Sequence, residues 1–212
     1  MVRRNDKVAF MSGAFVFPGG RVDEAVSGQE PVHADRWVHR FSDLTTTDEH
    51  VFRLAAAREL WEEAGVRVDP VDLVPLAHWV TPEIEIRRFD TRFFLARVPA
   101  DQTAQHDDGE TTELRWLAPA AAIAAAASGD IMLPPPTWTT LKRLSRHRTI
   151  DDVLRTAART PIVRVQPMLI RGDGPTLLTL PGDPTYPTID GWEIPETTRF
   201  RLEDGRWRPV TS

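Results

Sequence analysis

The sequence contains no cysteine and very little lysine, and both absences exclude particular chemistries. Without a thiol there is no thiolate nucleophile, no cysteine-bound zinc or iron–sulfur cluster and no disulfide. A Schiff-base enzyme needs a lysine whose pKa is lowered by an apolar setting. Neither lysine meets this requirement, because Lys7 follows Asp6 and Lys142 lies in the polar run 141–148. Carboxylates, histidines, hydroxyls and bound metal therefore remain as catalytic groups.

Charge and hydropathy exclude further classes of protein. The formal net charge of -5 argues against a dedicated nucleic-acid-binding protein, because a phosphate backbone requires a positive surface. The longest apolar stretch, residues 119–128, is shorter than the ~20 residues of a membrane span, so no membrane segment is expected. No apolar run follows the basic start, so no secretory signal is expected and a cytoplasmic location is predicted.

The residue pattern predicts a chain that contains both strands and helices. Strands are expected at 14–17, 73–80, 88–98, 113–117, 162–170 and 176–180, with hairpin turns at 172–174 and 204–205. Helices are expected from Thr47 or Asp48 to just before Gly65, and at 120–127, 138–146 and 150–159. Residues 25–47 are interpreted as a partly helical insertion.

Three carboxylates share one face of the first expected helix. Glu59, Glu62 and Glu63 stand at i, i+3 and i+4. Like charges at this spacing destabilise a helix, so a compensating partner is expected. A hard divalent cation is one such partner, since Mg²⁺ takes oxygen ligands. The alternative is a solvated acidic face with Arg58 and Arg67 as ion-pair partners.

The segment Arg58–Val66, which follows a Phe-Pro-Gly-Gly turn at 17–20, resembles the signature of the Nudix hydrolases, G-x5-E-x7-R-E-U-x-E-E-x-G-U, where U is aliphatic. The resemblance implies an α/β/α sandwich around a mixed sheet. It also implies a loop–helix–loop motif that holds Mg²⁺ or Mn²⁺ and cleaves a diphosphate linked to another moiety. A small-molecule diphosphate is thus the expected partner.

The resemblance assigns a role to each matching position of the motif. The resemblance implies that Glu62 and Glu63 bind the metal and that Glu59 binds metal or activates water. Arg58 is expected to orient the glutamates. The carbonyl of Gly19 is expected to join the metal shell, and Gly20, the first motif glycine, is expected to contact the substrate.

The first half of the motif departs from the family pattern. Gly20 and Arg58 are 38 positions apart instead of 14, an excess of about 24 residues. Strict counting back from Arg58 places the first motif glutamate at His50. Glu49 is adjacent to that position, and Asp23 and Glu24 after the turn are further alternatives.

Other segments resemble one branch of the family and indicate a substrate. Residues 10–20, 81–83, 87–94 and 180–184 are similar to the branch that includes peroxisomal coenzyme A diphosphatases, so coenzyme A or acyl-CoA is the expected substrate. Coenzyme A hydrolases of another branch carry R-x3-G-x3-F-P-G-G, and here Ala9 occupies the arginine position. A dinucleotide or ADP-sugar is the alternative substrate, and a catalytically silent ligand-sensing module is the alternative function.

Five further residues outside the motif are candidates for the site. Members of the family carry a further acidic residue beyond the motif, as metal ligand or general base. Here it is expected within 107–113, with Glu110 preferred over Glu113. Arg88 and Arg92 share one strand face and could bind a diphosphate or form surface ion pairs. Trp79 is the candidate for stacking on a base.

The expected domain organisation is a Nudix domain at 1–160 and an extension at 161–212 that packs on it. Family relatives carry a complete strand before Val2. Either that strand is missing here and leaves an exposed edge, or another segment pairs with the edge. Such an edge would favour a homodimer.

Overall fold

The computed structural model describes residues 1–7, 11–23, 41–106 and 111–210 of the 212-residue chain. Four α-helices and a 3-10 turn occur in these residues: α1 (Thr46–Ala64), the turn Pro70–Asp72, α2 (Pro119–Ser128), α3 (Pro135–Leu144) and α4 (Ile150–Ala157). None of the helices in these residues is both long and apolar enough to cross a lipid bilayer.

The described strands form three small sheets. The first has the order β2 (Phe15–Val16), β1 (Val2–Arg4), β5 (Thr111–Leu114), with antiparallel pairing throughout. The second has the order β4 (Asp90–Leu95), β3 (Val74–Val80), β6 (Arg164–Val165) and is mixed, because β3 is antiparallel to β4 and parallel to β6. The third is antiparallel, with the order β10 (Arg206–Pro209), β9 (Arg199–Glu203), β8 (Leu177–Thr179), β7 (Met168–Ile170).

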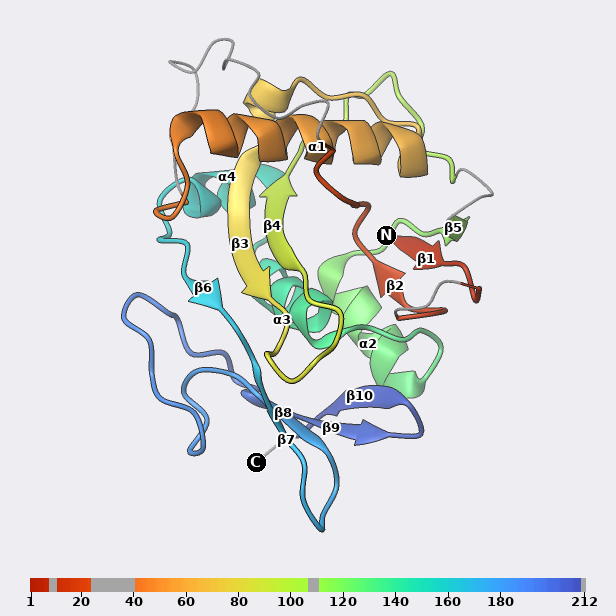
Figure 1. The fold of residues 1–212 in the computed structure, drawn as a ribbon. Coiled ribbons are helices and arrows are strands. Elements are labelled where there is room, and N and C mark those ends of the chain that lie inside the picture. Colours follow the sequence, from red (N-terminus) through yellow and green to blue (C-terminus); the bar gives the residue numbers. More distant parts are fainter. Residues whose placement is uncertain (8–10, 24–40, 107–110, 211–212) are drawn as a thin grey trace.

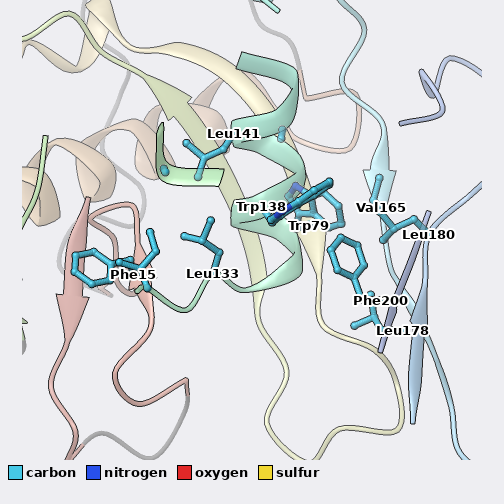
Figure 2. Packing of buried hydrophobic residues seen from close by; sticks show 12 residues of the cluster. Phe15, Trp79, Leu133, Trp138, Leu141, Val165, Leu178, Leu180 and Phe200 are labelled. Atoms are coloured by element: carbon cyan, nitrogen blue, oxygen red, sulfur yellow. The ribbon is translucent and has the colours of Figure 1, made fainter. Parts of the chain in front are cut away.

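The layers agree with the expected sandwich. α1 lies on one side of β3 and β4, and α2 and α3 lie on the other (Figures 1 and 2). β1 is paired on both sides, with β2 and with β5, which agrees with the alternative that another segment pairs with this edge. The homodimer based on that edge stays a prediction.

Local capping chemistry determines the ends of α1. The N-cap is Thr45, before both expected caps, Thr47 and Asp48. Its side chain accepts from the Asp48 amide, and the Asp48 carboxylate accepts from the Thr45 amide. This reciprocal pair is a capping box. At the other end Gly65 has φ 66 and its amide donates to the Trp61 carbonyl, as predicted for a helix that ends at glycine.

A buried ion pair docks the first half of α1 on the sheet. The side chains of Glu49 and Arg53 are fully buried, and Arg53 Nη2 lies 2.8 Å from Glu49 Oε1. Arg53 Nη1 also donates to the Leu73 carbonyl at 2.5 Å, and its guanidinium lies over the Phe94 ring. These contacts fix the helix relative to the start of β3 and to β4.

The hydrophobic core joins the two halves of the chain. Trp138 of α3 meets Phe200 of β9 edge-to-face, with ring centroids 5.5 Å apart, and Leu178 and Val165 lie in the same cluster as Trp79 of β3 (Figure 2). Residues 161–210 therefore share their core with residues of the N-terminal part.

One expected strand is divided between two sheets. Residues 162–170 form β6 in the mixed sheet and β7 in the C-terminal sheet, because Pro167 between them has no amide donor for a ladder. The predicted hairpin at 204–205 is confirmed, since Asp204 and Gly205 have φ 49 and 74 and connect β9 to β10.

Candidate active site

The turn after β2 contacts the last part of α1 through Glu63. The backbone amide of Gly19 donates to Glu63 Oε2 at 2.9 Å, although 44 residues separate them. Glu63 is only 6% exposed, whereas Gly19 lies at the surface. The buried carboxylate thus holds the turn against the helix.

Glu59 contacts the same turn at Gly20, the residue after Gly19. A Cβ built on Gly20 would lie 2.3 Å from Oε1 and 2.4 Å from Oε2 of Glu59, so only glycine leaves room for this carboxylate. The side chain of Glu59 is 13% exposed. Glu59 and Glu63 therefore converge on two adjacent glycines, as their i, i+4 spacing predicts.

Arg58 links the turn to Glu59 from the side. Its Nη2 donates to Glu59 Oε1 at 2.6 Å and to the carbonyl of Arg21 at 2.7 Å, and its Nη1 forms an ion pair with Asp23. The role of orienting a glutamate, implied for Arg58 by resemblance, fits this contact. The sequence offered Asp23 only as a substitute for a motif glutamate and gave no sign of the Arg21 carbonyl.

The carboxylates at the turn fit a divalent cation. Across the described ranges no three His, Asp or Glu side chains are close enough together to hold a metal ion, and Glu62 is exposed. Mg²⁺, however, is usually bound through one or two carboxylates plus substrate phosphate. Glu59 and Glu63 supply two, and the missing side chain of Gly20 is the space in which the Glu59 carboxylate lies.

The four residues considered for the position of the first motif glutamate have different surroundings in the structure. Glu49 belongs to the buried pair with Arg53, and its Oε2 accepts from the Phe41 amide. His50 is buried, and burial followed by the positive charge of Arg53 lowers its pKa. Asp23 is the alternative in contact with Arg58, and Glu24 lies outside the described residues.

Trp79 and Arg92 are not presented to a ligand in this structure. Trp79 is 4% exposed, and its ring meets Trp192 edge-to-face in the core. The Arg92 side chain is 3% exposed, with Nη2 on Asp43 at 2.5 Å and Nη1 on Asp90. These placements do not agree with base stacking or with diphosphate binding.

A buried histidine completes the network around Arg92. His78 Nε2 lies 2.9 Å from Asp90 Oδ1, and the His78 ring meets Phe41 edge-to-face. Burial, then the charge of Arg92, lowers the pKa of His78. The network ties Asp43, just before α1, to the mixed sheet, and the sequence gave no signal for it because Asp43 is remote along the chain.

The remaining candidates either form no hydrogen bond or ion pair with the glycine turn in the described part of the chain or lie outside that part. Arg88 is exposed on the connection between β3 and β4, at the end of these strands that points away from α1 (Figure 1). Glu110, Asp107 and Asp108 lie outside the described residues. Glu113 is half-buried, and its Oε1 accepts from Arg115 Nε at 2.5 Å.

Comparison with known proteins supports the reading of the motif. The NUDIX domain profile matches residues 1–134, more than half of the chain and all of the turn and α1. The chain belongs to the Nudix family. This confirms the resemblance inferred from Arg58–Val66 and the expected class of Nudix diphosphate hydrolase.

Relatives of the Nudix chain cover most of its length at low identity. Acyl-coenzyme A diphosphatase NUDT19 of Homo sapiens is 27% identical over 88% of this chain and 71% of its own, and that of Xenopus laevis is 22% identical over 88% and 70%. Putative nudix hydrolase 7 of Caenorhabditis elegans is 27% identical over 88% and 68%. The crystal structure of a NUDIX hydrolase from Alicyclobacillus acidocaldarius has TM-score 0.57 at 22% identity, over 73% of this chain and 86% of that one, which confirms the fold.

Proposed function

We propose that this Nudix chain hydrolyses the diphosphate linkage of a nucleotide derivative with Mg²⁺ or Mn²⁺ bound at the glycine turn. The observation that carries the proposal is the convergence of Glu59 and Glu63 on Gly19 and Gly20. A cation between these carboxylates and the diphosphate would neutralise phosphate charge and lower the pKa of a water molecule.

Each residue at the turn has a distinct part in this proposal. Glu63 accepts from the Gly19 amide, so it holds the turn against α1, and its carboxylate would contribute to the cation site. Glu59 lies beside it, where its carboxylate can orient water or bind metal, and Arg58 sets its orientation. Glu62, exposed on the next face, would complete the oxygen ligands on closure around substrate.

Two residues outside the turn also belong to the proposal. Glu110, which precedes β5 in the sequence, is the proposed extra ligand or general base. Arg88 is exposed and forms no ion pair with a carboxylate among the residues described, so it is available to a substrate phosphate that reaches this end of the mixed sheet.

Coenzyme A or acyl-CoA is the proposed substrate. The support is the coverage of 88% of the chain by relatives named acyl-coenzyme A diphosphatase. A dinucleotide or ADP-sugar is the alternative, since a cation at the turn would engage only the diphosphate, which these compounds share with coenzyme A.

The experiment is a mass-spectrometric screen of coenzyme A, an acyl-CoA, a dinucleoside polyphosphate and an ADP-sugar, each with Mg²⁺ or Mn²⁺. Glu63→Gln is the control, because it retains the shape and an oxygen for the Gly19 amide but loses the charge. We expect metal-dependent cleavage of the coenzyme A compounds by the wild type and a loss of at least roughly 100-fold in the variant. A folded wild-type protein that cleaves none of the four compounds would leave the silent ligand-sensing module as the function.

A further inference from the structure

An apolar cavity lies between α2 and β10, two elements that are placed apart from α1 (Figure 1). Its volume is about 190 Å³. The lining comes from α2, α3, β10 and the segment that joins α2 to α3, and neither α1 nor the glycine turn contributes a residue. The cavity is therefore separate from the candidate active site.

The inner wall of the cavity is apolar. Ile131, Leu133 and Trp138 line it and are buried, and Trp207 of β10 packs against the same core cluster. An apolar cavity of about 150 Å³ can stay dry and bind benzene, so a cavity of about 190 Å³ has room for a chain of roughly six to eight carbon atoms.

The charged residues of the lining all carry the same sign. Arg206 and Arg208 belong to the lining, whereas no carboxylate among the described residues does. Arg206 is exposed, and its Nη1 donates to the Gly129 carbonyl at 3.3 Å, with no carboxylate as an ion-pair partner in the described ranges. Guanidinium groups bind carboxylates through charge-assisted hydrogen bonds. The complementary ligand therefore has an apolar body and one anionic end.

The strand register adds to the positive charge at this place. Arg208 of β10 lies directly opposite Arg201 of β9. Glu203 is 3.2 Å from Arg201 and 3.7 Å from Arg208, so one carboxylate is shared by two arginines. Like charges directly opposite each other destabilise a sheet, and a bound anion would reduce the repulsion.

We propose that this cavity binds a medium-chain fatty carboxylate. The alkyl chain lies against Ile131, Leu133 and Trp138, and the carboxylate accepts hydrogen bonds from Arg206 and Arg208. The site goes beyond the proposed function and does not depend on it, because no residue of the glycine turn takes part.

The test is isothermal titration calorimetry of the full chain with octanoate. Octanol has the chain without the charge, and acetate has the charge without the chain. We expect one octanoate per chain, at least about tenfold weaker binding of octanol and no measurable binding of acetate, because chain and charge both contribute.

Two sets of variants test the two ends of the ligand. Replacing Arg206 and Arg208 together with glutamine should weaken octanoate binding about tenfold. Arg201→Gln is the matched control, since Arg201 lies opposite Arg208 but does not line the cavity, and it should change the affinity less than about threefold.

A larger side chain on α2 tests the cavity itself. Ala126 lines the cavity, so Ala126→Phe should fill part of it and weaken octanoate binding more than about tenfold. Ala124 is exposed on the same helix and does not line the cavity, so Ala124→Phe should bind octanoate like the wild type. Melting temperatures establish that both variants fold.

A crystal structure with octanoate tests the proposal without any variant. We expect the chain in the cavity and the carboxylate within hydrogen-bonding distance of Arg206 or Arg208. Equal affinity for octanol and octanoate, octanoate bound elsewhere in the crystal, or full binding by a folded Ala126→Phe would overturn the inference. So would a homodimer that Ala126→Phe dissociates and octanoate does not, because a second copy would then be the occupant.

Discussion

Replacing Gly20 with alanine tests the geometry of the site most directly. The added Cβ would lie 2.3 to 2.4 Å from three atoms of the Glu59 carboxylate group, whereas ordinary contact begins at 3.4 Å. Glu59 must therefore move by about 1 Å. The backbone itself can accept alanine, because Gly20 is absent from the glycines with positive φ.

The displacement should cost activity rather than stability. The atoms that clash are the far end of a flexible side chain, and alanine also restricts the unfolded chain by about 0.4 to 1 kcal/mol, so the net change in the free energy of unfolding should stay within about 1 kcal/mol. A shift of 1 Å would lengthen the Arg58–Glu59 contact from 2.6 Å beyond hydrogen-bonding distance. Misplacement of this size can cost roughly 100-fold in rate, equivalent to about 2.7 kcal/mol.

Gly19→Ala is the control that separates the displacement of Glu59 from other effects of an alanine in the turn. A Cβ on Gly19 meets no atom within 4 Å, and alanine retains the amide that binds Glu63 and the adjacent carbonyl. We expect kcat/KM for the diphosphate substrate to fall roughly 100-fold in Gly20→Ala and no more than about threefold in Gly19→Ala, with melting temperatures close to that of the wild type. Equal activity of the two variants would refute the placement of Glu59 against the turn.

Two further predictions concern stability. Arg53→Met removes the partner of the fully buried Glu49 carboxylate, so the free energy of unfolding measured in urea should fall by about 3 to 5 kcal/mol. Adding Glu49→Leu to this variant should recover most of the loss. A loss below about 1 kcal/mol in Arg53→Met would contradict the burial of the pair. Burial would raise the pKa of Asp183, but hydrogen bonds from Arg199 and Thr185 lower it to about 2. Because the folded pKa lies below the unfolded value of 3.8, the contribution of about 2 kcal/mol is present above pH 4 and is lost as the pH falls toward 2. Asp183→Asn should thus be less stable than wild type at pH 7 and approach it near pH 2, and a difference independent of pH would refute the assignment.

Local chemistry made much of the fold predictable. The end of α1 at Gly65 and the hairpin at 204–205 depend on single residues with positive φ and on their neighbours in sequence. Pairing between remote strands could not be predicted in this way. An alternating pattern at 162–170 indicates a strand, but the partner of each half depends on elements that lie far away along the chain.

The site was predictable to the extent that it is carried by one helix. Helical periodicity alone brings Glu59 and Glu63 to one face. The alternating strand pattern did not predict the burial of Arg92. Such a pattern places Arg92 on one face of the strand, but that face is open to solvent or ligand only where no helix covers it. α1 covers this face, and the Arg92 guanidinium lies 5.3 Å from the ring centroid of Phe52.

The long insertion is compatible with an intact site for an energetic reason. Gly20 and Arg58 are 38 positions apart instead of 14, so the connecting loop is nearly three times as long as in the family motif. Each doubling of loop length costs about 0.6 kcal/mol of closure entropy, which gives about 1 kcal/mol here. One hydrogen bond contributes about as much, and two independent contacts, Gly19 with Glu63 and Arg58 with the Arg21 carbonyl, close the turn on the helix. Neither contact uses residues 24–40, so these contacts, and not the spacing of the motif, hold the carboxylates together.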